Sequence, residues 1–160
     1  MSSIVDRFST HLREVLVGSI RIATELKNTS VEPMHLLLAL SMQKGSVANE
    51  VLNRYNLGTK NIEKLVPKLK PGIKAEKNQN LSPFSLNSKT ALEKALIVAQ
   101  KNGHNYLGTE HLLSALVNLN DEQLEQLFKK NNLKKTELND QLEIVLTTAS
   151  QFPQITEVPE

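Results

Sequence analysis

Hydrophobic residues recur along the first part of the chain at spacings of three and four, which is the pattern of one buried helix face. This stripe begins at Phe8 and ends at Leu26. Residues 35–40 then form a run that is apolar nearly all round, which predicts a buried central helix. The pair Gly45-Ser46 and the later Thr59 mark two further helix starts. The first part of the chain therefore predicts four helices.

The same pattern returns 76 residues later, so that 8–66 aligns with 84–142 without a gap and with eleven identical positions. Other pairs keep their apolar character, and Asn120-Asp121 and Thr136 take the places of the third and fourth helix starts. The identical residues in the first copy are Phe8, Ser9, Leu16, Ala23, His35, Leu36, Leu37, Ala39, Leu40, Asn56 and Leu57. We interpret this register as the duplication of one unit.

The duplication predicts the organisation of the chain: an all-α fold of about eight helices in two four-helix repeats. The first repeat is expected at 8–66 and the second at 84–149. Between them, 67–83 holds three prolines and a glycine and predicts an exposed linker. The segment 150–160 holds two prolines and no helical pattern, and we expect it to be a tether to further chain.

Polar residues mark where the helices begin. Ser9 and Ser85 are expected N-caps of the two long helices, because a serine hydroxyl accepts a free first-turn N–H. Thr109 stands where an N-cap belongs in the second copy, and Pro33 stands in the same place or at the first helical position.

The glycines of the second copy have expected structural roles. Gly103 is suited to end a helix in the left-handed conformation, and Gly108 to form a tight turn. The first copy has Lys27 in place of Gly103, and we expect Asn28 to take over the left-handed position there.

Composition and charge exclude several classes of function. Lys+Arg number 19 and Asp+Glu 17, a net charge of +2, which argues against nucleic acid as the main partner. The absence of cysteine excludes disulfides, thiolate zinc sites and cysteine nucleophiles. No apolar run is long enough to span a membrane, and the N-terminus has no leader-like pattern. A cytoplasmic protein without membrane partners is the expectation.

Catalytic and cofactor motifs are missing as well. The sequence has no phosphate-binding loop, so this segment is not expected to hydrolyse ATP or to hold a cofactor. His35 and His111 occupy equivalent positions, but neither has a second ligand one helical turn away, so we expect buried structural histidines rather than a metal site. An enzyme with a cryptic site remains a third hypothesis, without a nucleophile–base set to support it.

The segment 102–116 resembles the signature of the Clp N-terminal repeat, since it reads Asn-Gly-His-Asn-Tyr-Leu-Gly-Thr-Glu-His-Leu-Leu-Ser-Ala-Leu. The resemblance covers about 8–146. It implies two four-helix units related by a pseudo-twofold axis, placed before the ATPase rings of unfoldases such as ClpC, ClpA or ClpB. Such a module receives adaptor proteins and unfolded or tagged substrates. It implies ATP and a Clp protease assembly as partners of the rest of the chain.

The resemblance to the ClpC branch also implies a phosphoarginine site. Glu110, together with Thr109, matches the acidic position of that site. The first copy has Met34 and Pro33 there, which implies one site rather than two. A structural account stays open, because a carboxylate in the first turn of a helix interacts favourably with the helix dipole.

Two functional hypotheses from different classes therefore remain. The first is a non-catalytic module of a larger unfoldase that delivers substrates or adaptors, with an apolar cleft between the two units as a possible peptide site. The second is a free-standing accessory subunit that regulates a Clp protease assembly. Continuation of the gene into a Walker motif separates them.

Overall fold

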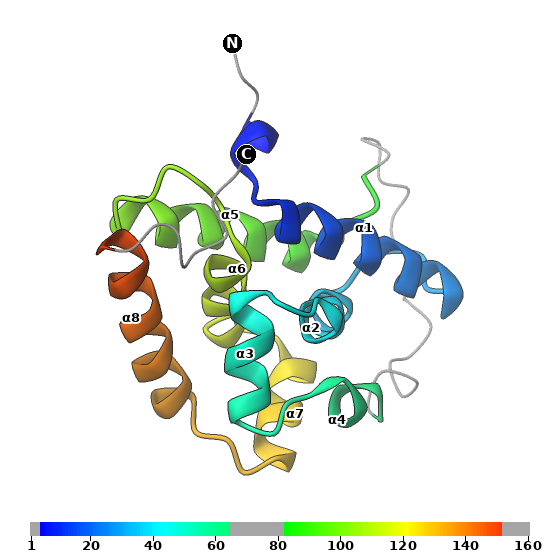
Figure 1. Ribbon diagram of the computed structural model, residues 1–160. Coiled ribbons are helices and arrows are strands. Elements are labelled where there is room, and N and C mark those ends of the chain that lie inside the picture. The colour runs from blue at the N-terminus through cyan, green and yellow to red at the C-terminus, as the bar shows by residue number, and fades with distance from the viewer. Residues whose placement is uncertain (1–3, 65–81, 152–160) are drawn as a thin grey trace.

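The computed structural model describes residues 4–64 and 82–151. These residues form eight α-helices and one short 3-10 helix, which confirms the all-α prediction (Figure 1). The bounds are η1 Ile4–Arg7, α1 Thr10–Glu25, α2 Pro33–Met42, α3 Val47–Arg54, α4 Thr59–Glu63, α5 Leu86–Lys101, α6 Thr109–Val117, α7 Glu122–Lys130 and α8 Lys135–Gln151. We call α1–α4 the first unit and α5–α8 the second unit.

Serine hydroxyls cap the first helix of each unit, as predicted. Ser9 accepts a hydrogen bond from the N–H of Leu12 at 3.0 Å, and Ser85 accepts one from the N–H of Ser88 at 3.1 Å. Each cap satisfies a first-turn donor that would otherwise lack an intrahelical partner. The caps lie 76 residues apart, so the two units begin in the same way.

The expected N-cap at Thr109 was wrong, because the cap of α6 is Gly108 and Thr109 is the first helical residue. The side chain of His111 accepts the N–H of Gly108 at 2.9 Å, and the hydroxyl of Thr109 accepts the N–H of Ala48 in the other unit. Pro33 occupies the equivalent first position of α2, where its missing N–H costs nothing. The last helix begins at Lys135, one residue before the expected Thr136.

The left-handed position after α1 was also assigned to the wrong residue. Lys27 itself has φ 58°, and its counterpart Gly103 has φ 69°. Asn28 does not take over this role, because it is not among the residues with positive φ. Its side-chain oxygen instead accepts a hydrogen bond from His35 Nε2 at 3.1 Å. The backbone path is thus conserved between the units even though only one of them has a glycine there.

The two units are connected by a reciprocal pair of isolated β-bridges. Phe8 of the first unit pairs with Leu107 of the second, and Phe84 of the second pairs with Val31 of the first. Both pairs obey the 76-residue shift, since Phe8 corresponds to Phe84 and Val31 to Leu107. In each bridge, the residue before the first helix of one unit pairs with the turn before the second helix of the other unit. This exchange is expected for a pseudo-twofold arrangement.

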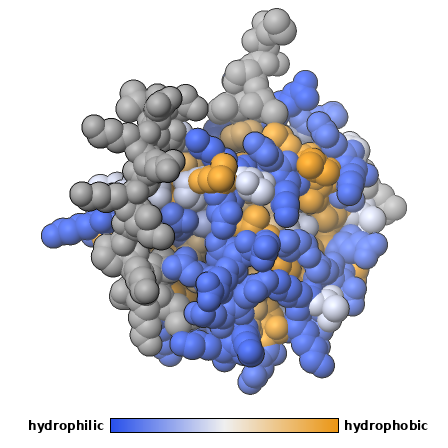
Figure 2. Space-filling view, turned by 180° about the vertical axis from the view of Figure 1, so that it is seen from behind, coloured by the Kyte–Doolittle hydropathy of each residue, from blue (hydrophilic) through white to orange (hydrophobic). Residues whose placement is uncertain are grey.

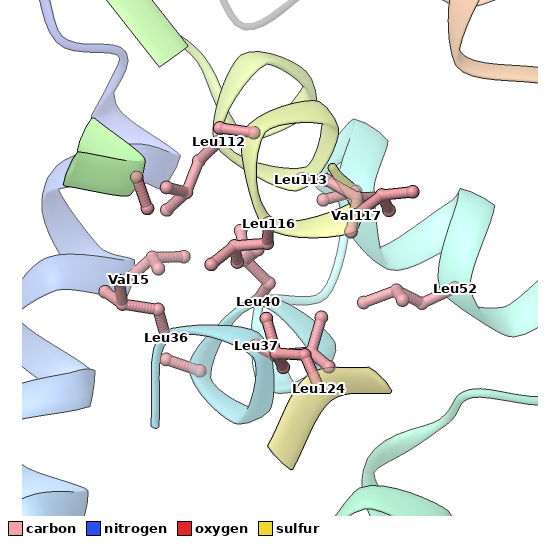
Figure 3. Close-up of a cluster of buried hydrophobic side chains, with 14 of the residues drawn as sticks. Val15, Leu36, Leu37, Leu40, Leu52, Leu112, Leu113, Leu116, Val117 and Leu124 are labelled. Carbon is pink, nitrogen blue, oxygen red and sulfur yellow. The ribbon is translucent and has the colours of Figure 1, made fainter. Parts of the chain in front are cut away.

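The core is built around α2 and α6, the two helices predicted to be apolar on all sides. Figure 3 shows leucines of these helices facing one another, with side chains from α1, α3 and α7 around them. All of the central leucines are completely buried: Leu36, Leu37, Leu40, Leu112, Leu113 and Leu116. Burial of such side chains contributes about 1.5–3 kcal/mol each and holds the two units as one body.

Parts of the expected linker and tail lie outside the described residues, namely 67–81 and 152–160. The end of the expected linker is described: the carbonyl of Pro83 accepts the N–H of Val31 at 2.7 Å, within one of the bridges. No helix in the described part of the chain is long and apolar enough to cross a membrane.

Candidate functional site

His111 of α6 lies at the centre of a buried polar cluster in the second unit. Its Nδ1 accepts the N–H of Gly108 at 2.9 Å, so the ring proton is on Nε2, which is 2.6 Å from Nδ1 of His104. The ring of Tyr106 lies against both histidines, with ring centroids 5.2 Å from each. The turn that holds His104 and Tyr106 thus packs against the first turn of α6.

His35 makes the equivalent contacts in the first unit, with smaller partners. Its Nδ1 accepts the N–H of Glu32 at 2.8 Å, and its Nε2 donates to Asn28. Asn28 stands where the second unit has His104, and Ser30 where it has Tyr106. The first unit therefore keeps the histidine cap but lacks the aromatic stack.

Burial controls the protonation of these histidines. It lowers the pKa of His35 to about 4. It lowers the pKa of His111 to about 3, with a further contribution from the neighbouring His104. Burial also lowers the pKa of His104, although the backbone carbonyl of Leu146 opposes this. His35 and His111 are therefore neutral near pH 7, and a neutral ring leaves Nδ1 free to accept the backbone N–H.

Among the described residues, no group of three potential metal ligands occurs.

Glu110 is completely buried beside this cluster. Its carboxylate accepts a hydrogen bond from the hydroxyl of Tyr106 at 3.0 Å. It also lies directly against Gly108, where a Cβ atom would come 2.1 Å from Glu110 Oε1. A Cβ atom at position 108 would therefore force the buried Glu110 side chain to shift, and Glu110 points into the protein.

Thr109, the other residue expected to bind a ligand, is buried as well. Its hydroxyl oxygen accepts the N–H of Ala48 at 3.2 Å, which joins α6 of the second unit to the start of α3 in the first. The side chains of Thr109 and Glu110 are thus both engaged inside the protein.

An open groove of about 620 Å³ lies between α1 and α2 of the first unit. It lies within one unit, whereas the sequence suggested a cleft between the two. Its lining residues are Arg13, Glu14, Val17, Gly18, Arg21, Ile22, Glu25, Ala39, Met42 and Gln43. Sequence reasoning missed these residues, although a glycine in the middle of a predicted helix was an available signal.

The groove has an apolar floor and charged edges. Val17 is 57% exposed and Met42 51% exposed, so two large apolar side chains at the groove are open to solvent. Gly18 and Ala39 place only small groups between α1 and α2. Arg21 stands on the outer edge of α1, and on the other side Gln43 of the α2 C-cap donates to the carboxylate of Glu14.

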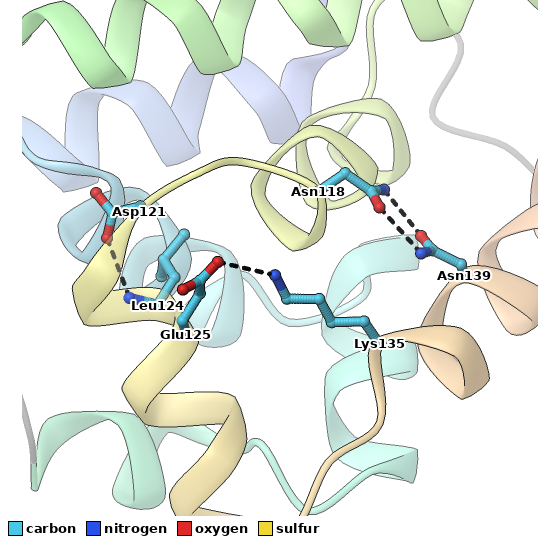
Figure 4. Close-up of polar contacts among 6 residues, drawn as sticks. All are labelled: Asn118, Asp121, Leu124, Glu125, Lys135 and Asn139. Carbon is cyan, nitrogen blue, oxygen red and sulfur yellow. Dashed lines mark hydrogen bonds and ion pairs between the residues drawn. The ribbon is translucent and has the colours of Figure 1, made fainter.

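The corresponding face of the second unit is built differently. Lys94 stands in place of Gly18, and Asn118 in place of Met42. The amide of Asn118 exchanges two hydrogen bonds with that of Asn139 on α8, at 2.8 and 3.0 Å (Figure 4). The side chain at the end of α6 is therefore tied to α8, whereas Met42 at the end of α2 is open to solvent.

Exposed apolar residues also occur away from the groove. Leu86 is 80% exposed at the start of α5, and Ile144 is exposed on α8. On the face shown in Figure 2, hydrophobic residues appear as separate patches among hydrophilic ones. What distinguishes the groove is the combination of exposed apolar side chains with a hollow between two helices, an arrangement suited to binding a peptide.

Comparison with curated proteins gives relatives of two kinds. The chain is 32% identical over 115 residues to the uncharacterized protein Rv2667 of Mycobacterium tuberculosis, covering 72% of this chain and 44% of that protein. It is 31% identical over 111 residues to the negative regulator of genetic competence ClpC/MecB of Bacillus subtilis, covering 69% of this chain and 14% of that protein. The chain thus spans less than half the length of these relatives.

Solved structures share the fold at low sequence identity. The N-terminal domain of the chaperone ClpD from Arabidopsis thaliana superposes with a TM-score of 0.73 at 18% identity, covering 91% of this chain and 97% of that one. A complex of the ClpV N-domain with a VipB peptide gives a TM-score of 0.66 at 15% identity, covering 90% and 89%.

A family model gives the most extensive match. The model of the Clp repeat (R) N-terminal domain matches residues 7–131 and 83–158, which together include both copies found in the sequence. Domains of this kind are generally non-catalytic. The reciprocal bridges, the duplicated histidine caps and this match lead to one conclusion: the chain belongs to the Clp repeat N-terminal domain family.

Proposed function

We propose that this chain is a non-catalytic N-terminal module that binds adaptor proteins and unfolded or tagged substrates for a Clp-family unfoldase. Its docking surface is the groove between α1 and α2. ATP and the Clp protease assembly are engaged by other parts of the parent protein. Family membership supports the general role, and the groove supports the position of the surface.

The single observation that carries this proposal is the hollow between α1 and α2 with Val17 and Met42 exposed beside it. Exposed apolar side chains at a concave site are the usual means by which a protein binds a peptide segment. The related ClpV N-domain has been solved with a VipB peptide, which supports peptide binding as a property available to this fold.

Binding of a permanently unfolded polypeptide tests the proposal. We expect fluorescein-labelled, reduced and carboxymethylated lactalbumin to bind the chain, with binding measured by fluorescence anisotropy. The double variant Val17→Asp/Met42→Asp should weaken binding about tenfold or more, a loss of about 1.4 kcal/mol. Ile144→Asp is the matched control, because Ile144 is equally apolar and exposed but lies on α8. No binding by the wild type, or equal losses in both variants, contradicts the proposal.

A free-standing accessory subunit of a Clp protease assembly is the second candidate. The specific support is the length of the relatives: the matched segment makes up 44% of the mycobacterial protein but only 14% of ClpC/MecB. Relatives of this family therefore include proteins much shorter than ClpC. Sequencing the gene beyond this segment separates the candidates, because a following Walker motif supports the module and a stop codon supports the subunit.

Phosphoarginine binding by Glu110 and Thr109 remains a separate proposal. An acidic side chain beside free helix-start N–H groups can hold a phosphorylated guanidinium through charge pairing and anion contacts. In the described conformation the ligand must first displace the hydroxyl of Tyr106 from Glu110. Calorimetric titration with phosphoarginine should therefore show tighter binding by Tyr106→Phe and loss of binding by Glu110→Gln. The absence of heat in the wild type and in Tyr106→Phe contradicts it.

A further inference from the structure

Sulfur chemistry in this chain is confined to methionine, because the sequence has three methionines and no cysteine. Met1 lies outside the described residues. The other two, Met34 and Met42, stand at the second and the last position of α2. Peroxides oxidise the thioether of methionine to a sulfoxide, which turns an apolar side chain into a polar one. The two methionines of α2 can therefore be compared as sites of oxidation.

The two side chains differ in their access to solvent. Met34 is 1% exposed and belongs to the hydrophobic core, whereas Met42 is 51% exposed at the end of the helix. A dissolved oxidant has to reach the sulfur atom before it can react. Peroxide therefore has access to Met42 in the folded protein, while the core protects Met34.

Met42 is also part of the groove between α1 and α2. The other apolar residues of the lining are Val17, Gly18 and Ile22 on α1 and Ala39 on α2. These four carry only hydrogen or hydrocarbon side chains, which peroxide leaves unchanged. Met42 is thus the one apolar position of the lining whose polarity an oxidant can change.

The second unit has no such position. It contains no methionine, and the counterpart of Met42 is Asn118, whose amide is hydrogen-bonded to that of Asn139. The counterpart of Met34 is Glu110. In the two units a response to peroxide through sulfur is therefore confined to the first.

We propose, on the basis of the proposed peptide-binding function, that Met42 is a redox-sensitive residue of the groove. A peroxide oxidises its thioether to the sulfoxide, and the groove then binds apolar segments less tightly, because the polar S–O group has to lose water when a segment covers it.

The chemistry needs only a peroxide. A lone pair of the Met42 sulfur attacks one oxygen of hydrogen peroxide, so that an S–O bond forms and the O–O bond breaks. The sulfur is oxidised by two electrons, and the second oxygen takes up the proton of the first and leaves as water. A dithiol reverses the change in the presence of a methionine sulfoxide reductase: the sulfoxide oxygen leaves as water and the dithiol becomes a disulfide.

Peptide mass spectrometry tests the site of oxidation. The chain is treated with hydrogen peroxide, the excess is destroyed with catalase, and the protein is digested with trypsin. Met34 and Met42 fall in one tryptic peptide, between Lys27 and Lys44, whose fragment masses assign the added oxygen. We expect Met42 to react about tenfold faster than Met34 in the folded protein and at a similar rate in urea. Equal rates in the folded protein overturn the inference.

Binding of the labelled lactalbumin tests the consequence. Oxidation of the wild type should weaken binding about fivefold in fluorescence anisotropy, and a methionine sulfoxide reductase with a dithiol should restore it. Helical circular dichroism should stay unchanged, since Met42 ends its helix and is open to solvent. Unchanged affinity after complete oxidation of Met42 overturns the inference. A loss of affinity that accompanies a loss of helix also overturns it.

Two leucine variants serve as a matched pair, because leucine replaces methionine at similar volume and does not react with peroxide. Met42→Leu should have the same affinity before and after peroxide. Met34→Leu should show the same fivefold loss as the wild type, because it keeps Met42. A loss on oxidation in Met42→Leu as large as in the wild type overturns the role of Met42.

Failure of this inference differs from failure of the proposed function. An untreated wild type that binds lactalbumin, with unchanged affinity after oxidation, supports the groove but rejects the redox role of Met42. An untreated wild type that does not bind lactalbumin rejects both.

Discussion

The two units are most alike where they meet and least alike where they face outward. The central helices share His-Leu-Leu and Ala-Leu at identical positions, at residues 35–40 and 111–116. On the outer faces, Gly18 and Met42 of the first unit correspond to Lys94 and Asn118 of the second. The comparison teaches that the duplicated core fixes the fold, while the outer faces differ in the size and charge of their side chains.

A second contrast concerns the turn before each central helix. The second unit fills this region with His104, Tyr106 and Glu110, whose side chains contact one another around His111. The first unit has Asn28 in place of His104, and it also has Ser30 and Met34 in place of Tyr106 and Glu110. The second unit is thus more dependent on a buried polar network, and such networks are costly to break.

The largest expected effect is the loss of stability in acid that both units share. His35 and His111 have pKa values of about 4 and about 3, below the ordinary 6.5, so the unfolded chain binds more protons between these values. Stability is therefore full well above pH 6.5, and it falls as the pH decreases through 6.5. From pH 6.5 to 5 the two sites together should cost on the order of 3 kcal/mol.

Urea titrations at several pH values check this expectation. His35→Gln and His111→Gln should each remove about half of the pH dependence. A stability that stays constant between pH 7 and 5 contradicts the buried neutral state of both histidines.

Gly108→Ala should have the next largest effect, and it should show that the two units differ in their sensitivity to substitution at this position. The new Cβ would collide with Glu110 Oε1 and come 3.0 Å from Tyr106 Cε2. We expect a loss of about 2–3 kcal/mol, because the buried carboxylate has to move from its hydroxyl partner. The counterpart substitution in the first unit, Glu32→Ala, should cost less than about 1 kcal/mol. Chemical denaturation measures both, and equal losses would show that the close packing around Gly108 is unimportant.

Replacing each buried histidine by alanine sharpens the same contrast. His111→Ala should destabilise the protein by about 2–3 kcal/mol, since it removes the cap of Gly108 and the ring that His104 and Tyr106 pack against. His35→Ala should cost about 1–2 kcal/mol, because its partners are Glu32 and Asn28 only. The reverse order in urea unfolding would contradict the greater importance of the second cluster.

The smallest expected effect comes from the left-handed position at the end of the first helix of each unit. Lys27→Gly should stabilise the protein by about 0.5–1 kcal/mol, because φ 58° is unfavourable for a residue with a Cβ atom. Gly103→Lys should destabilise it by a similar amount. Differential scanning calorimetry should show a raised Tm for Lys27→Gly and a lowered Tm for Gly103→Lys. Tm shifts of the same sign in both variants would reject the equivalence of the two positions.

The fold could be predicted because its signals are local and repeated. The apolar runs at 35–40 and 111–116, the serine caps at Ser9 and Ser85, and the 76-residue register each describe a short segment. The second appearance of each signal supports the first. The left-handed Lys27 escaped prediction because a lysine, unlike a glycine, carries no sequence signal for a positive φ.

The candidate site was less accessible to sequence reasoning. The signature placed Thr109 and Glu110 side by side at a helix start, but their inward orientation depends on Ala48 and Tyr106 as hydrogen-bond partners. The groove is defined by a missing side chain at Gly18 and by the way α1 packs against α2. A sequence records residue types, whereas a hollow depends on the space between elements.

A two-dimensional NMR titration with the unfolded lactalbumin tests most directly the central claim that the duplicated units differ in their outer faces and that only the first binds. The predicted result is a set of amide shifts at 13–25 and 39–43, with little change at the equivalent 89–101 and 115–119. Shifts of equal size in both sets, or shifts confined to the second unit, would contradict the account.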